Sequence, residues 1–197
     1  RLLLVGNNAW HYDALADARA MDVEDRVILA DYVPESDVPL YLASADVCLC
    51  LRWPTSRETS SSWLRCLAAG RATIITDLSH LVDIPSFDPR SWRLQYAPEA
   101  STKDPESRPP VEPACISIDI LDEDHSLRLA MRRLATDARL RATLGERAKA
   151  LWRARFSLER MVSRYRDVIR TATDSASRVE RPDGLPQHFS TDGAEHA

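Results

Sequence analysis

Short apolar runs alternate along this chain with segments whose apolar residues recur at helical spacing. The apolar runs lie at Leu2–Val5, Val47–Leu51, Ala72–Thr76 and Cys115–Ile120. Runs of this length without polar alternation are typical of parallel strands that are buried on both faces. The amphipathic stretches between them predict crossover helices. The pattern therefore predicts an α/β fold built on a doubly wound parallel sheet.

One βαβ unit, within Ala45–Asp77, is the centre of this pattern. Its first strand, Val47–Leu51, is expected to be buried, and a polar loop follows it. Hydroxyl side chains in 55–62 predict a capped helix start, and Gly70 is a suitable residue just after the helix C-terminus. The apolar face of the helix consists of Trp63, Leu64, Leu67 and Ala68. The loop is therefore expected at the carboxyl edge of a parallel sheet.

The start of this helix is a candidate anion site. Amides of a first helical turn point outward at the positive end of the helix dipole, which suits a phosphate or diphosphate. Thr59, Ser60 and Ser61 are small enough for a ligand to approach closely. The alternative stays open that these residues only cap the helix and that Glu58 only complements its dipole.

The N-terminal segment predicts two further strands and two helices. Gly6 follows the first strand, but G-N-N-A-W lacks the second and third glycines of a dinucleotide fingerprint, which argues against nicotinamide or flavin binding. The next strand and its exit span Arg26–Val33, and Ser36 is expected to cap a short helix with Pro39 in its first turn. The apolar face of the first helix is predicted from Trp10, Ala14, Ala18 and Met21.

The C-terminal third predicts helices and a tail. A long, proline-rich loop around one candidate strand, Trp92–Tyr96, precedes them. Helices are expected to begin at Asp122 or Asp124, near Asp137, and at Ser157. The last helix carries an apolar stripe of Leu158, Met161, Val162, Tyr165, Val168 and Ile169. One domain is expected over 1–172, with a disordered tail over 173–197.

Composition excludes some classes of function. The 197 residues carry a net charge of −4, which argues against a general nucleic-acid-binding protein. Between Leu127 and Arg170, however, 13 Arg or Lys face four Asp or Glu, a net charge of +9. This segment could contact an anionic membrane surface, although solvated helix faces explain it more simply.

The four cysteines have neither paired nor zinc-site spacing, so no metal site is expected. Buried, reduced thiols are consistent with a cytoplasmic protein, and peripheral contact with the inner face of the membrane stays open as an alternative. No signal peptide or membrane-length apolar run is present. Because Arg1 leads directly into a core strand, the chain is expected to be the C-terminal part of a longer protein.

The stretch ADVCLCLRWPTSRETSSSWLRCLAAGRATIITD and the later RFSLERMVSRYRDVI resemble a known family. They are similar to the C-terminal, Rossmann-like nucleotide-sugar-binding domain of family 4, GT-B fold, retaining glycosyltransferases. The resemblance spans about Arg1–Ala172 and implies the C-terminal half of a GT-B fold with C-terminal helices. It also implies retaining hexosyl transfer from a nucleoside diphosphate sugar to an acceptor that the sequence does not identify, without a cofactor or an essential metal.

The resemblance also implies roles for individual residues. Glu58 matches the first acid of a Glu-x7-Glu segment, which contacts the transferred sugar and would make it the catalytic residue. The other expected substrate-binding residues are Thr59, Ser60 and Ser61 for the diphosphate, Arg52 as an extra cation, and Tyr32 and Val33 for the base.

Two features of the family are missing from this chain. With seven residues between the two acid positions, Cys66 stands where the second acid would follow Glu58, and the register counted back from Gly70 places Arg57 and Arg65 at the two acid positions. The R-x4-K arrangement that precedes the first strand in the family is also absent. The alternative is therefore a non-catalytic Rossmann-like binding or scaffold module. His80 is the only histidine close to the expected site in sequence, and a structural or surface role is expected for it.

Overall fold

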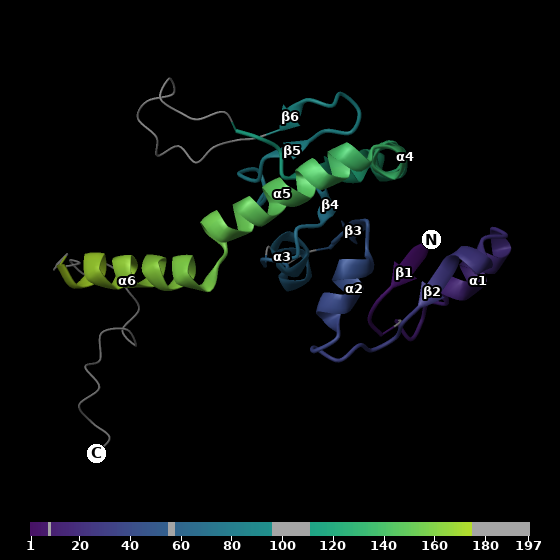
Figure 1. Cartoon of the computed structure of the whole chain (residues 1–197), viewed down its shortest axis with the longest axis horizontal. Helices are drawn as coiled ribbons and strands as arrows, with labels where there is room; N and C mark the ends of the chain where they lie inside the picture. The colour runs from purple at the N-terminus through teal and green to yellow at the C-terminus, as the bar shows by residue number, and fades with distance from the viewer. Residues whose placement is uncertain (8, 55–57, 96–110, 175–197) are drawn as a thin grey trace, which may run out of the picture. The chain divides into compact units, whose positions relative to one another are not determined.

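The computed structural model of the chain describes residues 1–7, 9–54, 58–95 and 111–174 (Figure 1). Internal contacts divide the chain into two compact units, 1–156 and 157–197. Of the strands and helices in these described ranges, the first unit holds all except the last helix, α6. The expected long loop at 96–110 and most of the expected tail, 175–197, lie outside the described residues.

A five-stranded sheet with the order β3-β4-β7-β5-β6 forms the centre of the first unit. Its strands are β3 (Val47–Cys50), β4 (Ala72–Thr76), β5 (Ser86–Phe87), β6 (Leu94–Gln95) and β7 (Cys115–Ile118). The first four in this order run parallel, and β6 pairs antiparallel with β5. Every residue of β4 and β7 is buried, as strands covered on both faces require. The predicted α/β fold with a parallel sheet is confirmed.

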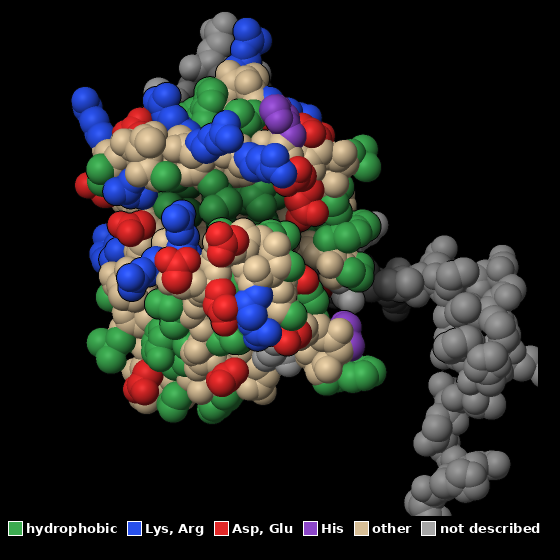
Figure 2. Space-filling view, turned by 90° about the vertical axis from the view of Figure 1, so that its right-hand side faces the viewer, with side chains coloured by type: hydrophobic (Ala, Val, Ile, Leu, Met, Phe, Trp, Pro, Cys, Tyr) green, Lys and Arg blue, Asp and Glu red, His purple; other side chains and the backbone are tan. Residues whose placement is uncertain are grey.

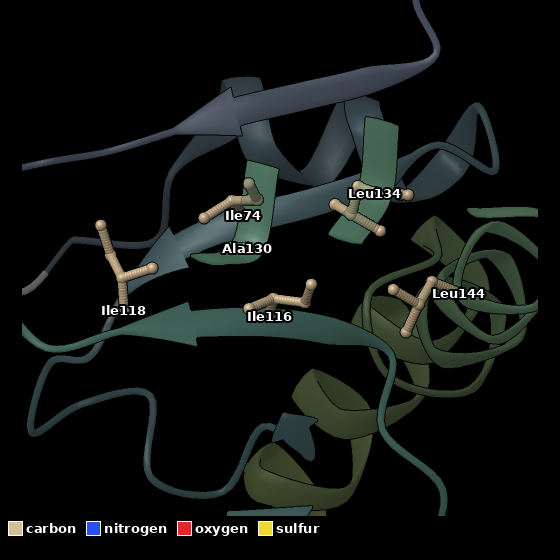
Figure 3. Close-up of a cluster of buried hydrophobic side chains, with 7 residues drawn as sticks. Ile74, Ile116, Ile118, Ala130, Leu134 and Leu144 are labelled. Carbon is tan, nitrogen blue, oxygen red and sulfur yellow. The ribbon is translucent and has the colours of Figure 1, made fainter. Parts of the chain in front are cut away.

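Helices cover both faces of this sheet. Successive residues of β4 point to opposite faces, so their packing partners show which helix covers each face. The helices are α3 (Ser61–Ala68), α4 (Glu123–Thr136) after the 3₁₀ turn η2 (Ile120–Asp122), and α5 (Ala138–Arg155). Ile74 packs in one core cluster with Leu134 of α4 and Leu144 of α5 (Figure 3). Ile75 packs in a second cluster with Leu67 of α3. The sheet is therefore doubly wound, as the sequence predicts.

The turn between α3 and β4 is tightly packed. Gly70 has φ +66°, and the amides of Gly70 and Arg71 donate to the carbonyls of Leu67 and Cys66 at 2.9 and 3.0 Å. This arrangement closes the helix C-terminus and favours glycine at this position, as predicted. A Cβ on Gly145 of α5 would lie 2.3 Å from the Gly70 carbonyl oxygen. Two glycines therefore allow α5 to cross directly over this turn.

The expectation that the first strand of the central unit is fully buried is wrong. β3 lies at one edge of its sheet and ends at Cys50, and Leu49 is 39% exposed. Among the described residues, no strand pairs with its outer side. Its apolar sequence is that of an interior strand, so composition alone does not reveal its position.

The N-terminal segment forms a separate two-stranded parallel sheet, β1 (Leu2–Leu4) and β2 (Val27–Leu29). The helix α1 (Ala14–Ala20) and the 3₁₀ turn η1 (Glu24–Arg26) connect the two strands. The predicted helical face is wrong at both ends, since α1 excludes Trp10 and Met21. The Asp13 side chain accepts from two amides of the first turn and so starts the helix later, which leaves Trp10 96% exposed.

The second short helix, α2 (Val38–Ser44), also begins later than predicted. Asp37, not Ser36, occupies the N-cap position, and Pro39 lies in the first turn as expected. The Ser36 hydroxyl instead donates to the neighbouring Asp37 carboxylate at 3.0 Å. Further along, β6 is shorter than the predicted strand and excludes Trp92.

The second unit contains the helix α6 (Leu158–Asp174). Ser157 caps it as predicted, because its Oγ accepts from the Arg160 amide at 3.4 Å. The helix extends two residues into the expected tail. Its apolar stripe is exposed along most of its length, and in the described part of the chain no helix is long and apolar enough to cross a membrane.

Candidate functional site

The N-terminus of α3 lies at the carboxyl edge of the five-stranded sheet, because the helix follows the end of the parallel strand β3. Ser60 has an extended backbone and is the N-cap, and its Oγ accepts from the Trp63 amide at 3.3 Å. The capping serine satisfies one amide of the first turn and leaves the neighbouring amides to solvent or a ligand. Thr59 and Ser61 flank it and are exposed.

A small cavity lies between this helix start and the end of β4. Arg52, Glu58 and Ser60, which sequence reasoning selects, line it together. The Arg52 guanidinium and the Glu58 carboxylate form an ion pair at 2.5 Å, and their side chains are 45% and 42% exposed. The pair therefore lies at the mouth of the cavity, where both solvent and a ligand could reach it. The remaining lining residues are Cys50, Trp63, Ile75, Thr76, Leu78, His80 and Leu81.

The other residues expected to bind the donor lie outside this cavity. Tyr32 and Val33 follow β2 in the two-stranded sheet, and Tyr32 is 73% exposed. Neither lines the cavity, and neither do Thr59 and Ser61. The structure thus brings together three of the seven residues that were expected at the site.

Thr76 and His80 are two polar residues of the cavity that were not predicted as site residues. Thr76 is the last residue of β4 and is 2% exposed, and its Oγ1 has no hydrogen-bond partner in the described part of the chain. Its position at the carboxyl end of a parallel strand is the signal that could have identified it. His80, for which a structural or surface role was expected, is half-buried and lines the same cavity.

Two cysteines close to this cavity, Cys48 and Cys66, have raised thiol pKa values. Cys50 Sγ lies 3.8 Å from Cys66 Sγ. A hydrogen bond with Cys48 lowers the pKa of Cys66, but the bond with Cys50 and burial outweigh it and raise that pKa to about 12. The hydrogen bond with Cys66, followed by burial, raises the pKa of Cys48 still further. A thiol in this state is a poor nucleophile and a poor metal ligand. No group of three or more potential metal-binding side chains occurs within the described ranges.

Carboxylates follow three adjacent strands at the same edge. Asp77 comes after β4, Asp119 after β7 and Asp88 after β5. Burial, followed by the charges of Asp119 and Asp88, raises the pKa of Asp77. Arg90 pairs with Asp88 at 3.2 Å and with Asp119 at 3.0 Å. Negative charge therefore gathers beyond β4, and Arg90 neutralises part of it.

Neither position for a second acid carries a carboxylate. Cys66 is buried and faces the cysteines of β3, so it offers no polar group to a ligand. Arg65 is exposed, and it pairs with Glu35, in the loop before α2, at 2.8 Å. The ribose contact of the family therefore has no direct counterpart in α3.

The positive charge of the C-terminal helices is partly neutralised. Arg and Lys side chains (blue) and Asp and Glu side chains (red) lie close together on the face in Figure 2. Five arginines of α4 and α5 form ion pairs with acids at 2.8–4.0 Å. They are Arg128, Arg133, Arg141, Arg147 and Arg155. Solvated helix faces account for these two helices better than a lipid-binding surface does.

Comparison with known proteins gives a likeness of fold. No protein-family model and no curated protein sequence matches this chain. A solved structure, the sucrose-phosphate synthase from Thermosynechococcus elongatus, superposes with a TM-score of 0.60 at 18% sequence identity. The match covers 89% of this chain and 39% of that protein. The fold is therefore a Rossmann-like α/β fold of the kind found in GT-B glycosyltransferases.

Proposed function

We propose that residues 1–156 form the nucleotide-sugar-binding domain of a glycosyltransferase similar to family 4 enzymes. The observation that carries the proposal is the cavity at the N-terminus of α3, where Arg52, Glu58 and Ser60 meet at the carboxyl edge of the sheet. Ligands of open α/β sheets bind at this edge, and helix N-termini favour phosphates. The likeness to a sucrose-phosphate synthase supports a sugar-transferring function.

In this proposal each residue has a separate role. The amides of Thr59, Ser60 and Ser61 hold the diphosphate of the donor, and Glu58 contacts the hydroxyls of its sugar. Arg52 holds Glu58 in place in the free protein and supplies a positive charge beside the leaving diphosphate. Tyr32 and Val33 support the base. The longer enzyme would transfer a hexose with retention, and this chain by itself would bind the donor without turnover, because positioning of the acceptor supplies much of the rate.

Titration with UDP and GDP, followed by NMR, tests the diphosphate site. The amide signals of Thr59, Ser60 and Ser61 are expected to shift on addition of either nucleotide. The chain provides a matched control, because Ser157 caps α6 in the same way. Amides of Leu158 to Arg160 are expected to remain unchanged. Equal shifts at both helix starts would indicate non-specific anion binding and contradict the proposal.

The variant Glu58→Gln tests the sugar contact. Loss of a hydrogen bond to a charged group costs about 1.5–3 kcal/mol, so affinity for the correct donor is expected to fall roughly ten- to hundredfold while nucleotide affinity stays constant. Glu35→Gln is the matched control, because Glu35 also pairs with an arginine at the surface but does not line the cavity. A lowered melting temperature with normal donor binding would reduce Glu58 to a charge at the helix start.

The alternative, a non-catalytic binding module, is favoured by one observation. In the register counted from Glu58, the second acid position is the buried Cys66, so α3 lacks the acid that holds the ribose in the family. The same nucleotide titration separates the two proposals. If the chain binds neither UDP nor GDP, it has the fold of a donor-binding domain but not its ligand-binding function. That result would favour the non-catalytic module.

A further inference from the structure

Two cysteines of the central βαβ unit have their sulfur atoms in contact. Cys50 is the last residue of β3, and Cys66 lies in the second turn of α3. Their Sγ atoms are 3.8 Å apart. Cys50 packs against the core cluster of Trp63 and Ile75, and Ile75 is its register partner in β4. Register partners in parallel strands point to the same face of the sheet, so the Cys50 thiol lies on the face that α3 covers.

The same two cysteines lie on either side of the candidate site in the sequence. Arg52, Glu58 and Ser60, which line the cavity, all lie between them. A bond between the two sulfurs would therefore join the strand that ends before the site to the helix that begins at it. Closing a loop with a disulfide stabilises a folded protein, in the simplest account because it restricts the unfolded chain.

We propose that Cys50 and Cys66 are a site of reversible oxidation, and that the disulfide formed between them stabilises the first unit and weakens donor binding at the start of α3. The existence of the disulfide depends only on the contact between the two sulfurs. Its effect on donor binding rests on the proposed function.

A peroxide supplies the oxidising equivalents. Cys66 is 5% exposed, whereas Cys50 is only half-buried, so a small oxidant reaches Cys50 first. The peroxide transfers one oxygen to the Cys50 sulfur, which becomes a sulfenic acid, and one water is released. The Cys66 sulfur then attacks the Cys50 sulfur, the sulfur–oxygen bond breaks, and the hydroxyl leaves with the Cys66 proton as a second water. Two thiols are oxidised to one disulfide, and the peroxide is reduced to two waters.

The reactivity of Cys66 sets the rate of the second step. Its pKa of about 12 makes the thiolate scarce at neutral pH, which slows the attack. Direct contact between the sulfurs offsets this, because groups held next to each other react as if at very high concentration. The disulfide is therefore expected to form on the order of minutes to hours.

The other two cysteines provide matched controls. Cys48 also forms a hydrogen bond with Cys66 and is the competing partner for a disulfide. Cys115 is fully buried, and its thiol donates to the Pro85 carbonyl oxygen at 3.9 Å. We expect Cys115 to remain a thiol under conditions that oxidise the proposed pair.

The first experiment maps disulfides in the full chain after treatment with hydrogen peroxide, alkylation of the remaining thiols and digestion with trypsin. Trypsin cleaves after Arg52 and Arg65, so Cys50 and Cys66 fall on different peptides. Mass spectrometry is expected to detect these two peptides linked, and dithiothreitol to separate them. Cys48→Ser is expected to keep the link and Cys50→Ser to lose it. Absence of the link in the wild type, or its persistence in Cys50→Ser, would overturn the proposal.

Melting temperatures of the oxidised and reduced wild type provide the second measurement, which does not depend on how well a variant folds. The oxidised protein is expected to melt roughly 5–10 °C higher. Peroxide treatment of Cys50→Ser is expected to leave the melting temperature unchanged. An equal or lower melting temperature of the oxidised wild type would contradict a stabilising disulfide.

Calorimetric titration with UDP and GDP measures the effect on the candidate site. The disulfide draws the second turn of α3 towards β3, and the amides of Thr59 to Ser61 move with the start of the helix. Binding to the oxidised protein is expected to be weaker on the order of tenfold, and dithiothreitol is expected to restore it. Equal affinities of the two states would refute the effect on donor binding. If the reduced protein binds neither nucleotide, the proposed function fails, whereas the peptide map and the melting temperatures still decide whether the disulfide forms.

Discussion

The five-stranded sheet and the two-stranded sheet bury very different amounts of apolar surface. In the five-stranded sheet, β4 and β7 are buried at every position, and helices cover both faces. In the two-stranded sheet, Leu2 and Ile28 are at least 40% exposed, and Ala18 is the one buried residue among the described residues of 1–44. The pairs β3–β4, β4–β7 and β5–β7 are parallel, like β1–β2, so we expect any difference in stability between these strands to come from side-chain burial and not from strand pairing.

The comparison predicts unequal protection from hydrogen exchange. Amides of β4 and β7 should open only with the whole unit, whereas β1 and β2 should open locally. The expected difference is on the order of a thousandfold in exchange rate, about 4 kcal/mol in the free energy of opening. Exchange monitored by NMR measures both regions in one sample. Equal protection of the four strands would mean that the two sheets unfold together and do not differ in stability.

A matched pair of substitutions sharpens the comparison at the level of single side chains. Ile74 in β4 is fully buried, and Ile28 in β2 is 45% exposed. Ile74→Ala is expected to lower the free energy of unfolding by about 2–5 kcal/mol, because it leaves a cavity in the core, and Ile28→Ala by less than about 1 kcal/mol. Urea denaturation followed by circular dichroism gives both values. Similar losses at the two positions would show that the Ile28 side chain is packed against other side chains in solution and is not a solvent-exposed residue.

Gly145→Ala tests how tightly the well-buried region is packed. On helix propensity alone this change should stabilise α5 by about 1 kcal/mol. The added Cβ would lie 2.3 Å from the Gly70 carbonyl oxygen, however, and backbone cannot move aside as a flexible side chain can. The expected result is a loss of about 1–3 kcal/mol, measured in the same denaturation experiment. Stabilisation by the alanine would show that α5 can shift away from the turn at little cost.

The difference between the two regions also explains what the sequence could predict. In the βαβ unit the apolar runs, the capping Ser60 and Gly70 agree with one another, and the strands and helix lie where they were predicted. In the N-terminal region the prediction failed at Trp10 and Ser36, because capping by Asp13 and an N-cap at Asp37 decide where α1 and α2 begin. Local patterns predict an element well only where packing and capping favour the same boundaries.

The candidate site was predictable in part for a related reason. Arg52, Glu58 and Ser60 lie within nine residues of one another in the loop before α3, so the order of elements already predicts that they meet. Thr76 and His80 reach the cavity from the neighbouring strand and its loop, and that approach depends on the register between β3 and β4. A single sequence does not determine that register, so sequence reasoning can place Thr76 at the carboxyl edge of the sheet but cannot show that Thr76 and His80 reach this cavity.

The smallest expected effect concerns two carboxylates at the edge of the well-buried region. Burial raises the pKa of Asp88, but hydrogen bonds from the Arg90 amide, the Ser91 hydroxyl and the Arg90 guanidinium outweigh it, and the net pKa is lowered. The pKa of Asp77 is raised, first by burial and then by the charges of Asp119 and Asp88. Two acids that follow strands of one sheet therefore affect stability in opposite directions.

The direction of each pH dependence follows from these shifts. A lowered pKa in the folded state means that ionised Asp88 stabilises the fold above the unfolded pKa of about 4, and that this contribution is lost as the pH falls through the folded pKa. The raised pKa of Asp77 means that its ionised form destabilises the fold above the folded pKa, and that the penalty is relieved as the pH falls through that value. At pH 7, Asp88→Asn should lower the melting temperature and Asp77→Asn should raise it, each by less than the core substitutions, since neither change leaves a cavity in the core. The difference for Asp77→Asn should vanish by about pH 3, because the raised pKa of Asp77 leaves it protonated in both states there, whereas the difference for Asp88→Asn should decrease below about pH 4 and vanish only once the pH is below the lowered folded pKa of Asp88. Melting curves of the three proteins between pH 3 and pH 8 measure this convergence. A stabilising effect of Asp77→Asn that persisted at pH 3 would have to come from side-chain packing, and the carboxyl edge would then carry no electrostatic penalty in an otherwise well-packed region.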